Sequence, residues 1–189
     1  MILITGSTGL IGSEVLRGLS KAGMPARALT RDLKKARKMP GVTWVAGDLG
    51  KPETLPAAFE GAQTLFLLTH YLEDMVELQH NAIAAARAAG VTHVVKVSAF
   101  GASDHSKAPI GLWHYRVEKE LRESGLEWTM LRPHHFMQNL LAQPSTSSKA
   151  ASSTRLPETA RYRTWMPAMW QRSPSRPSRR RDTSVRNTW

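Results

Sequence analysis

The chain opens with Met1-Ile2-Leu3-Ile4-Thr5-Gly6-Ser7-Thr8-Gly9-Leu10-Ile11-Gly12, and this stretch decides the fold. The apolar run over residues 1–5 predicts a short buried strand, and apolar residues at helical spacing over 13–22 predict a helix. Three glycines with the spacing Gly-x-x-Gly-x-x-Gly lie between them. Glycine allows a tight turn and a close approach of the backbone to a ligand, and a helix N-terminus attracts anions. The stretch therefore predicts a loop that holds the pyrophosphate of a dinucleotide.

We expect the whole loop to contact the cofactor. Its members are Gly6, Ser7, Thr8, Gly9, Leu10, Ile11 and Gly12.

The following residues alternate between strand-like and helix-like patterns. Strands are predicted over residues 25–30, 42–46, 64–68, 93–97 and 128–131, and helices over 73–89 and 113–123. Regular alternation favours a parallel sheet, because parallel strands need helical crossovers. Residues 1–143 are thus predicted to form one α/β domain with a doubly wound parallel sheet, a Rossmann-type fold.

The residues after the second predicted strand bear on the choice of cofactor. An acidic residue there bonds the ribose 2′-hydroxyl of NAD, whereas an arginine accepts the 2′-phosphate of NADP. Arg31 occupies this position with Lys35 close by, which predicts NADP, and Asp32 leaves NAD as the alternative. Asp48, after the third predicted strand, is expected near the adenine, although an Asp that opens a loop is also a common turn residue.

Composition excludes several classes of protein. The 189 residues are 41% apolar and 22% charged, without cysteine, which excludes disulfides and thiolate catalysis. No apolar run approaches the roughly 18 residues of a membrane span, and the N-terminus lacks the features of an export signal. We expect a cytoplasmic protein without membrane contact.

The net charge of +11 is concentrated after residue 144. Residues 145–189 hold ten basic and two acidic side chains, a net of +8, which leaves +3 for the residues before them. This Arg/Ser/Pro-rich stretch shows no helical or strand period, so a disordered tail is predicted over 144–189. An alternative is that the tail binds nucleic acid through phosphates, with Trp165, Trp170 and Trp189 available for stacking.

Several motifs resemble the atypical short-chain dehydrogenases, especially their NmrA-like and NADPH:quinone oxidoreductase branch. They are the glycine loop, Thr30-Arg31, Gly47-Asp48, Val97-Ser98-Ala99, His114 to Lys119, and the stretch from Ser124 to Pro133 with Phe136 and Asn139. The resemblance covers nearly all of residues 1–143 and none of the tail.

This resemblance implies a cofactor across the carboxyl ends of the strands. Thr69, His70 and Ser98 would line its nicotinamide half. The superfamily's Tyr-x-x-x-Lys pair matches Tyr115 and Lys119. Tyrosine would protonate the substrate, lysine would lower the tyrosine pKa and hold the ribose, and Ser98 would bond the substrate oxygen.

Two alternatives accompany this assignment. Many NmrA-like proteins keep the lysine without the tyrosine, and some sense NADP without turnover. His114 and Glu118 also lie four residues apart and could merely pair on a helix surface.

His134 and His135 have no carboxylate or cysteine at ligand spacing, so no metal site is predicted.

The resemblance requires further strands and helices after Asn139, which the tail does not supply. The segment Trp165-Met166-Pro167-Ala168-Met169-Trp170-Gln171 has little codon freedom. Read one nucleotide earlier, its bases permit Val-Asp-Ala-Arg-Asp-Val-Ala, which resembles the family's segment at that place. Tyr162-Arg163-Thr164 likewise permits Val-Pro-Tyr. We therefore hypothesise that residues from about Pro144 onward are a frameshift product.

Two functions follow as hypotheses. The first is an NADPH-dependent reductase of a small carbonyl or quinone. The second is a non-catalytic NADP sensor that regulates a protein partner. A chain without its substrate-binding part could also be inactive.

Overall fold

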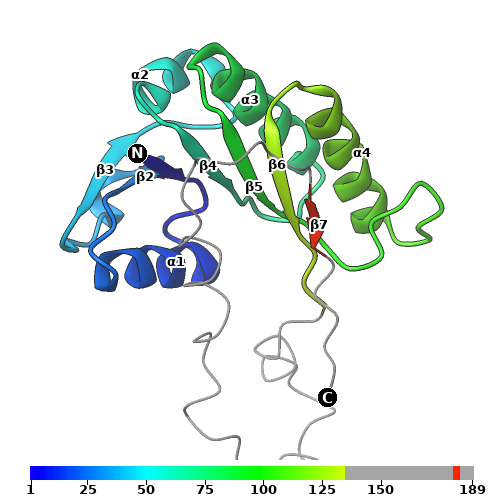
Figure 1. Cartoon of the computed structure of the whole chain (residues 1–189), viewed down its shortest axis with the longest axis horizontal. Coiled ribbons are helices and arrows are strands. Elements are labelled where there is room, and N and C mark those ends of the chain that lie inside the picture. The colour runs from blue at the N-terminus through cyan, green and yellow to red at the C-terminus, as the bar shows by residue number, and fades with distance from the viewer. Residues whose placement is uncertain (135–180, 184–189) are drawn as a thin grey trace, which may run out of the picture. The chain divides into compact units, whose positions relative to one another are not determined.

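The computed structural model describes residues 1–134 and 181–183, and these form one parallel sheet of order β3-β2-β1-β4-β5-β6-β7 (Figure 1). The strands are β1 (Ile2–Ile4), β2 (Ala26–Thr30), β3 (Val42–Ala46), β4 (Thr64–Leu67), β5 (His93–Val97), β6 (Glu127–Leu131) and β7 (Arg181–Thr183). The strand order reverses between β1 and β4. Open parallel sheets bind ligands outside the carboxyl ends of their strands at such a reversal. The predicted Rossmann-type α/β fold is confirmed.

Helices cover both faces of the sheet. They are α1 (Leu10–Lys21), α2 (Leu55–Phe59), α3 (Met75–Ala88) and α4 (Pro109–Glu123), with the short 3-10 helices η1 (Leu33–Lys35) and η2 (Pro52–Thr54). Figure 1 shows α1 on one face and α2, α3 and α4 on the other. This division follows from right-handed crossovers, because the chain moves outward to one side of β1 first and to the other side afterwards.

The main core lies between the sheet and the layer of α2, α3 and α4. Leu3 and Leu65 from the sheet and Phe59, Ile83 and Leu121 from the helices are at most 1% exposed. Each side chain of this kind stabilises the fold by about 1.5–3 kcal/mol when it is fully buried. This packing holds the carboxyl ends of the strands in place, and the loops that follow them can therefore form a site.

Two helices begin earlier than the periodicity predicts. The α4 helix starts at Pro109 instead of residue 113, because a proline has no N–H to leave unpaired and suits the first helical position. The α1 helix starts at Leu10 instead of residue 13, so that the glycine loop runs into its first turn. The strand bounds 42–46 and 93–97 are confirmed.

The tail contains one strand that its composition does not predict. Arg181–Thr183 pairs in parallel with residues 129–131 of β6. An edge strand presents unpaired backbone N–H and C=O groups, and these accept a further strand of almost any sequence. The rest of the predicted tail, including the three tryptophans, lies outside the described residues.

Candidate functional site

The loop between β1 and α1 presents an uncapped helix N-terminus. Gly9 is the N-cap residue of α1, and within the described part of the chain no side chain caps this end and no acidic residue lies in its first turn. The N–H of Gly9 donates to the carbonyl oxygen of Gly6 over 3.0 Å and closes the turn. The N–H groups of Leu10, Ile11 and Gly12 have no acceptor within the helix. This arrangement fits a phosphate group.

Two of the glycines are needed because backbone segments come very close together. A Cβ atom on Gly12 would lie 2.2 Å from the carbonyl oxygen of Gly6. A Cβ atom on Gly6 would lie 2.9 Å from the carbonyl oxygen of Leu68, and Gly6 has a φ of +62°. The N-terminus of α1 is thereby drawn to the carboxyl ends of β1 and β4.

The remaining loop residues divide into inward and outward positions. Ser7 is buried, and its Oγ donates to the carbonyl oxygen of Ile4 over 2.7 Å. Thr8 is exposed, Leu10 is 61% exposed and Ile11 is half-buried. Ser7 thus holds the loop against the strand, and its neighbours face outward, where a ligand can reach them.

The loop after β2 carries exposed cationic side chains and a carboxylate that already has a hydrogen-bond partner. Arg31 and Lys35 are exposed. Asp32 is the N-cap of η1, and its Oδ1 accepts from the N–H of Lys34 over 2.9 Å. The hydroxyl of Thr30 donates to the carbonyl oxygen of Asp32, which tightens the same turn. The arginine is thus available to a ligand, whereas the carboxylate is directed at its own helix.

Asp48 also organises its own loop. Its Oδ1 accepts from the N–H of Gly50 over 3.0 Å, and its N–H donates to the hydroxyl of Thr54 over 2.9 Å. These are the contacts of a turn residue, the second of the two readings that the sequence leaves open. Any adenine contact by Asp48 stays a prediction.

Thr69 and His70 follow β4, next to the loop between β1 and α1. The hydroxyl of Thr69 donates to the carbonyl oxygen of His70, and it accepts from Nε2 of the buried Gln79 over 2.8 Å. His70 Nε2 lies 2.9 Å from an oxygen of Asp74. Gln79, which the sequence analysis did not single out, therefore fixes one side of the expected nicotinamide position.

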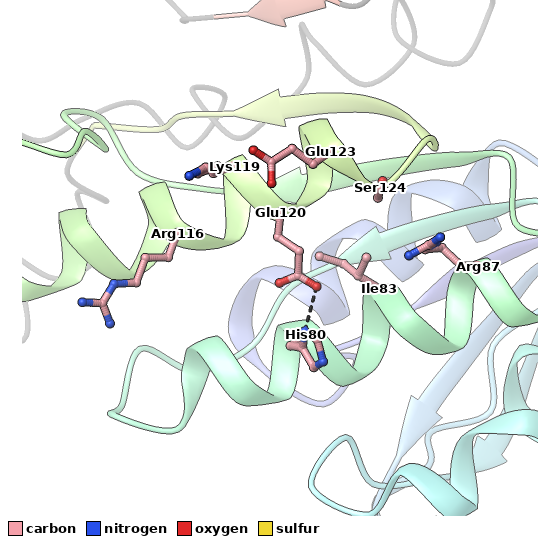
Figure 2. A pocket seen from close by; sticks show the side chains of 8 residues that line it. All are labelled: His80, Ile83, Arg87, Arg116, Lys119, Glu120, Glu123 and Ser124. Carbon is pink, nitrogen blue, oxygen red and sulfur yellow. Dashed lines mark hydrogen bonds and ion pairs between the residues drawn. The ribbon is translucent and has the colours of Figure 1, made fainter.

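The three residues expected to act in catalysis lie in different environments. Tyr115 is half-buried on α4. Ser98 is buried after β5, and its Oγ donates to Oε1 of Glu118 over 2.6 Å. Lys119 is exposed and lines an open groove of about 530 Å³ between α3 and α4 (Figure 2). In that groove Arg116 is its neighbour, and His80 pairs with Glu120.

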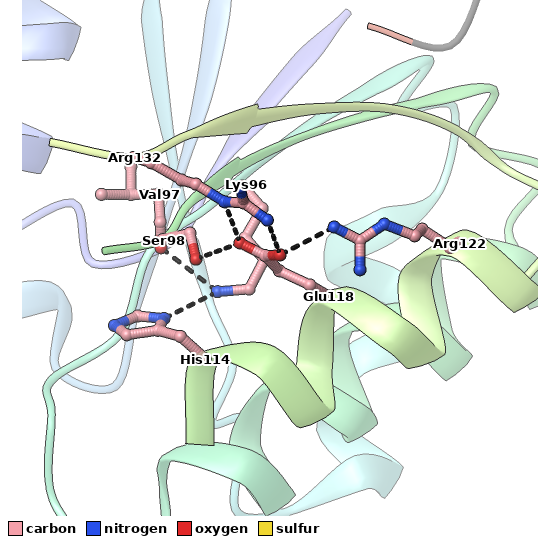
Figure 3. Close-up of polar contacts among 7 residues, drawn as sticks. All are labelled: Lys96, Val97, Ser98, His114, Glu118, Arg122 and Arg132. Carbon is pink, nitrogen blue, oxygen red and sulfur yellow. Dashed lines mark hydrogen bonds and ion pairs between the residues drawn. The ribbon is translucent and has the colours of Figure 1, made fainter. Parts of the chain in front are cut away.

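A group of polar side chains, all buried except the half-buried Arg132, joins β5, α4 and the end of β6 (Figure 3). We call Lys96, Ser98, His114, Glu118 and Arg132 the buried charge cluster. The carboxylate of Glu118, fully buried, accepts from Nε of Arg132 over 2.9 Å. Nζ of Lys96 lies 3.0 Å from Nδ1 of His114. The cluster therefore links residues 96 to 132 across three elements.

The expectation of a surface pair between His114 and Glu118 is wrong. Both side chains are buried, with exposed fractions of 8% and 0%. The helix turns this face toward the sheet, so the histidine meets Lys96 and the carboxylate meets Arg132. The spacing placed the two residues on one face of the helix. It could not tell whether that face would meet solvent or the sheet.

Burial and neighbouring charges displace the pKa values of the cluster. Burial lowers the pKa of Lys96 to about 7, against the attraction of Glu118. Burial and the Lys96 charge lower the pKa of His114 to about 3. Burial raises the pKa of Glu118, but the hydrogen bonds from Arg132 and Ser98 and the charges of Arg132 and Arg122 outweigh it and leave a net lowering. At neutral pH the cluster thus holds an ionised carboxylate, a neutral imidazole and a lysine amino group that readily gains or loses its proton.

Two further findings concern only residues 1–134 and 181–183. Among them no cluster of three or more His, Cys, Asp or Glu side chains could hold a metal ion. His134 is exposed, and His135 lies outside this part of the chain. No helix there is both long and apolar enough to cross a bilayer.

The model of the NmrA-like family matches residues 1–162. The chain belongs to the NmrA-like family. The match continues past residue 143, where the sequence analysis ended the resemblance, and so includes the first part of the expected tail.

One curated NmrA-like relative is the NAD(P)H azoreductase of Xenophilus azovorans. It is 46% identical over 143 residues, which cover 75% of this chain and 50% of the relative. The chain thus spans about half the length of the curated relatives that it matches.

Solved structures show the same fold with a cofactor. The NADPH-dependent quinone oxidoreductase QOR2 of Escherichia coli, solved with NADPH, has a TM-score of 0.70 and 33% identity, over 75% of this NmrA-like chain and 52% of that one. The triphenylmethane reductase of Citrobacter sp., solved with NADP(H), has a TM-score of 0.67 and 29% identity, over 74% and 51%.

Proposed function

We propose that this NmrA-like chain binds NADPH in the loop between β1 and α1 and reduces a small quinone, carbonyl or azo acceptor. The observation that carries the proposal is the uncapped N-terminus of α1, which Gly6 and Gly12 bring to the reversal of the strand order. Free N–H groups and the helix dipole at that point favour a pyrophosphate. When bound, the nicotinamide supplies the hydride.

The preference for NADPH rests on Arg31 and Asp32. The guanidinium of Arg31 is exposed where the 2′-phosphate would lie, and Lys35 adds a second cation. The carboxylate of Asp32 already accepts from the N–H of Lys34 and would have to leave that bond to hold a ribose hydroxyl. These contacts favour the phosphorylated cofactor.

Exposed apolar side chains support a flat, apolar acceptor. Leu10, Tyr71, Leu72 and Phe100 are 61%, 70%, 58% and 64% exposed. Leu10 begins α1 after β1, and the other three lie on the loops that follow β4 and β5, at the edge where the cofactor would end. Large exposed apolar side chains that gather at one edge are typical of a binding surface. Aromatic quinones and azo compounds suit such a surface.

Tyr115 is the first candidate for the donor of the proton that the reduction needs. The family resemblance suggests it, together with Ser98 and Lys119. The half-buried phenol of Tyr115 would donate the proton, and Ser98 would orient the acceptor. In the structure, however, Ser98 donates to Glu118, and Lys119 lines the groove between α3 and α4. Substitution of Tyr115 decides whether its hydroxyl is used.

A spectrophotometric assay tests the proposed activity. NADPH oxidation is followed with quinones, an azo dye and a small carbonyl compound, for the wild-type chain, Tyr115→Phe and Gly12→Val. Turnover that Gly12→Val abolishes supports a reductase with the cofactor in this loop, because a valine side chain cannot fit beside Gly6. Turnover that survives this change would contradict it.

A second candidate is an NADP sensor that regulates a protein partner. The exposed position of Lys119 favours it, since a lysine that does not face the cofactor cannot lower the pKa of a catalytic tyrosine. NADPH binding without oxidation of any acceptor would support the sensor. Binding is measured by calorimetry on the same samples.

A further inference from the structure

Lys96 lies in the interior of the fold, although nothing in the sheet requires a lysine at its position. It lies on β5 with an exposed fraction of 0%. Burying an ammonium group is costly unless other groups pair with it. Its Nζ donates to the carbonyl oxygen of Val97 at 3.3 Å and meets Nδ1 of His114 at 3.0 Å.

The other charged groups around Lys96 are already engaged with one another. The Glu118 carboxylate accepts from Arg132, Ser98 and Arg122, the last over 2.9 Å. Glu118 attracts the ammonium at a distance, and Arg132 repels it. His114 is thus the side chain to which Lys96 is directly hydrogen-bonded.

This contact determines where the imidazole of His114 carries its proton. An ammonium group has only donors, so Nδ1 must accept and the proton must lie on Nε2. Figure 3 shows the ring on the far side of the Lys96 ammonium from Glu118. Among the described residues, Nε2 has no hydrogen-bond partner, and it is not one of the three buried side-chain atoms that lack one. It is therefore a donor that solvent or a ligand can reach.

The fold places this donor at the cofactor edge of the sheet. The α4 helix returns antiparallel to β5, so its first turns lie beside the carboxyl ends of the strands. His114 is in the second turn of α4, which begins at Pro109. The phosphate loop and Thr69 follow the carboxyl ends of β1 and β4 at the same edge.

We propose that Lys96 and His114 form a proton relay, in which Nε2 of His114 donates the proton that accompanies hydride transfer to the acceptor. The inference rests on the proposed reductase function. The acceptor gains the hydride that a bound nicotinamide would supply, together with the Nε2 proton, and Nδ1 takes a proton from the Lys96 ammonium. The imidazole stays neutral and Lys96 becomes an amine. Water then protonates Nε2, and the Nδ1 proton returns to Lys96.

The acidities of the two groups suit this exchange. Burial lowers the pKa of Lys96 to about 7, so the ammonium gives and regains a proton near neutrality. Burial and the Lys96 charge lower the pKa of His114 to about 3, which keeps the imidazole neutral and able to pass a proton between its two nitrogens. Lys96 acts through the histidine and is a positioning residue.

Kinetics of four variants test the relay. His114→Gln is expected to lower kcat by about a hundredfold or more, the usual contribution of a general acid. Lys96→Met is expected to lower kcat and to remove the decline of kcat above about pH 7, because that decline reports loss of the Lys96 proton. NADPH affinity should stay within about twofold, as neither residue contacts the phosphate loop. His93→Gln, on the same strand but bonded to Thr129, is the control.

Tyr115→Phe provides the competing outcome. A fall of kcat in Tyr115→Phe with full activity in His114→Gln would overturn the relay and leave the reductase in place. Failure of the wild-type chain to oxidise NADPH with any acceptor would instead overturn the proposed function.

A measurement on the apo chain decides the relay without turnover. Long-range ¹H–¹⁵N NMR correlations report which imidazole nitrogen of His114 carries the proton. Below pH 7 we expect protonated Nε2 and bare Nδ1, with a change of that signal as Lys96 titrates, and loss of the change in Lys96→Met. Protonated Nδ1 in the wild-type chain would contradict the relay whatever the activity.

Discussion

Arg31 follows β2, at the position that would discriminate between NADPH and NADH in the proposed complex. Its exposed guanidinium is expected to pair with the 2′-phosphate of NADPH, a charge-assisted contact worth about 1.5–3 kcal/mol. Arg31→Ala should therefore raise the Kd for NADPH about tenfold or more and leave the Kd for NADH unchanged, as measured by calorimetry. Arg37→Ala, exposed just beyond η1, is the matched control. Equal losses for both cofactors would show that Arg31 does not contact the phosphate.

Because of Lys96, the free energy of unfolding should depend on pH in the alkaline range. Its pKa is about 7 in the folded chain against 10.5 when unfolded, so between these values the unfolded chain binds the extra proton. The free energy of unfolding should therefore rise with pH from about 7 toward 10, by up to about 1.4 kcal/mol per pH unit. Urea unfolding at pH 7 and pH 9 measures the rise.

Lys96→Met is the control for this prediction, because methionine fills similar space without a titrating group. The difference between the two pH values should become smaller in the variant. An equal rise in the variant would assign the effect to another group.

At the scale of elements, Glu118 connects β5, α4 and the residues after β6. Its buried carboxylate accepts from Ser98 and Arg132. In Glu118→Gln the amide keeps the shape but leaves Lys96, Arg132 and Arg122 without their counter-charge. Removing one partner of a buried ion pair costs about 3–5 kcal/mol, and we expect the free energy of unfolding to fall by that amount.

Denaturant unfolding with Glu123→Gln as control measures this loss. Glu123 lies on the same helix but is exposed, so its substitution should change stability by less than about 0.5 kcal/mol. Similar small effects for both variants would show that the cluster does not stabilise the junction.

At the scale of the whole molecule, the Arg/Ser-rich stretch differs from the remainder of the chain. We propose that residues from about Pro144 onward come from a shifted reading frame. Nucleotide sequencing of the locus should show a reading frame that encodes a Val-Asp-Ala-Arg-Asp-Val-Ala-like peptide one nucleotide before the codons of residues 165–171. An unbroken reading frame whose alternative encodes no family-like peptide outside residues 162–171, where the codons already fix most of it, would sink the proposal.

Mass spectrometry of the purified protein gives an independent check. If the shift is an error in the sequence, tryptic peptides should match the second frame. If the gene itself is damaged, they should match the Arg/Ser-rich residues.

The order of apolar runs and glycines by itself determined the parallel sheet and the tight turn between β1 and α1, and the motifs over residues 1–143 indicated the family. These features are local: an apolar period records which face of an element is buried, and the spacing of Gly6, Gly9 and Gly12 records where the backbone must turn. The bounds 42–46 and 93–97 were predictable for that reason, and so was Arg31 after β2.

Only the tertiary structure decided which polar side chains meet inside the fold. Lys96 and His114 are 18 residues apart, and Glu118 and Arg132 are 14 apart. Helical spacing put His114 and Glu118 on one face, but whether that face met solvent or the sheet depended on how α4 packs against β5 and β6. Buried charges find their partners through such packing, because a lone charge in the interior is too costly to persist.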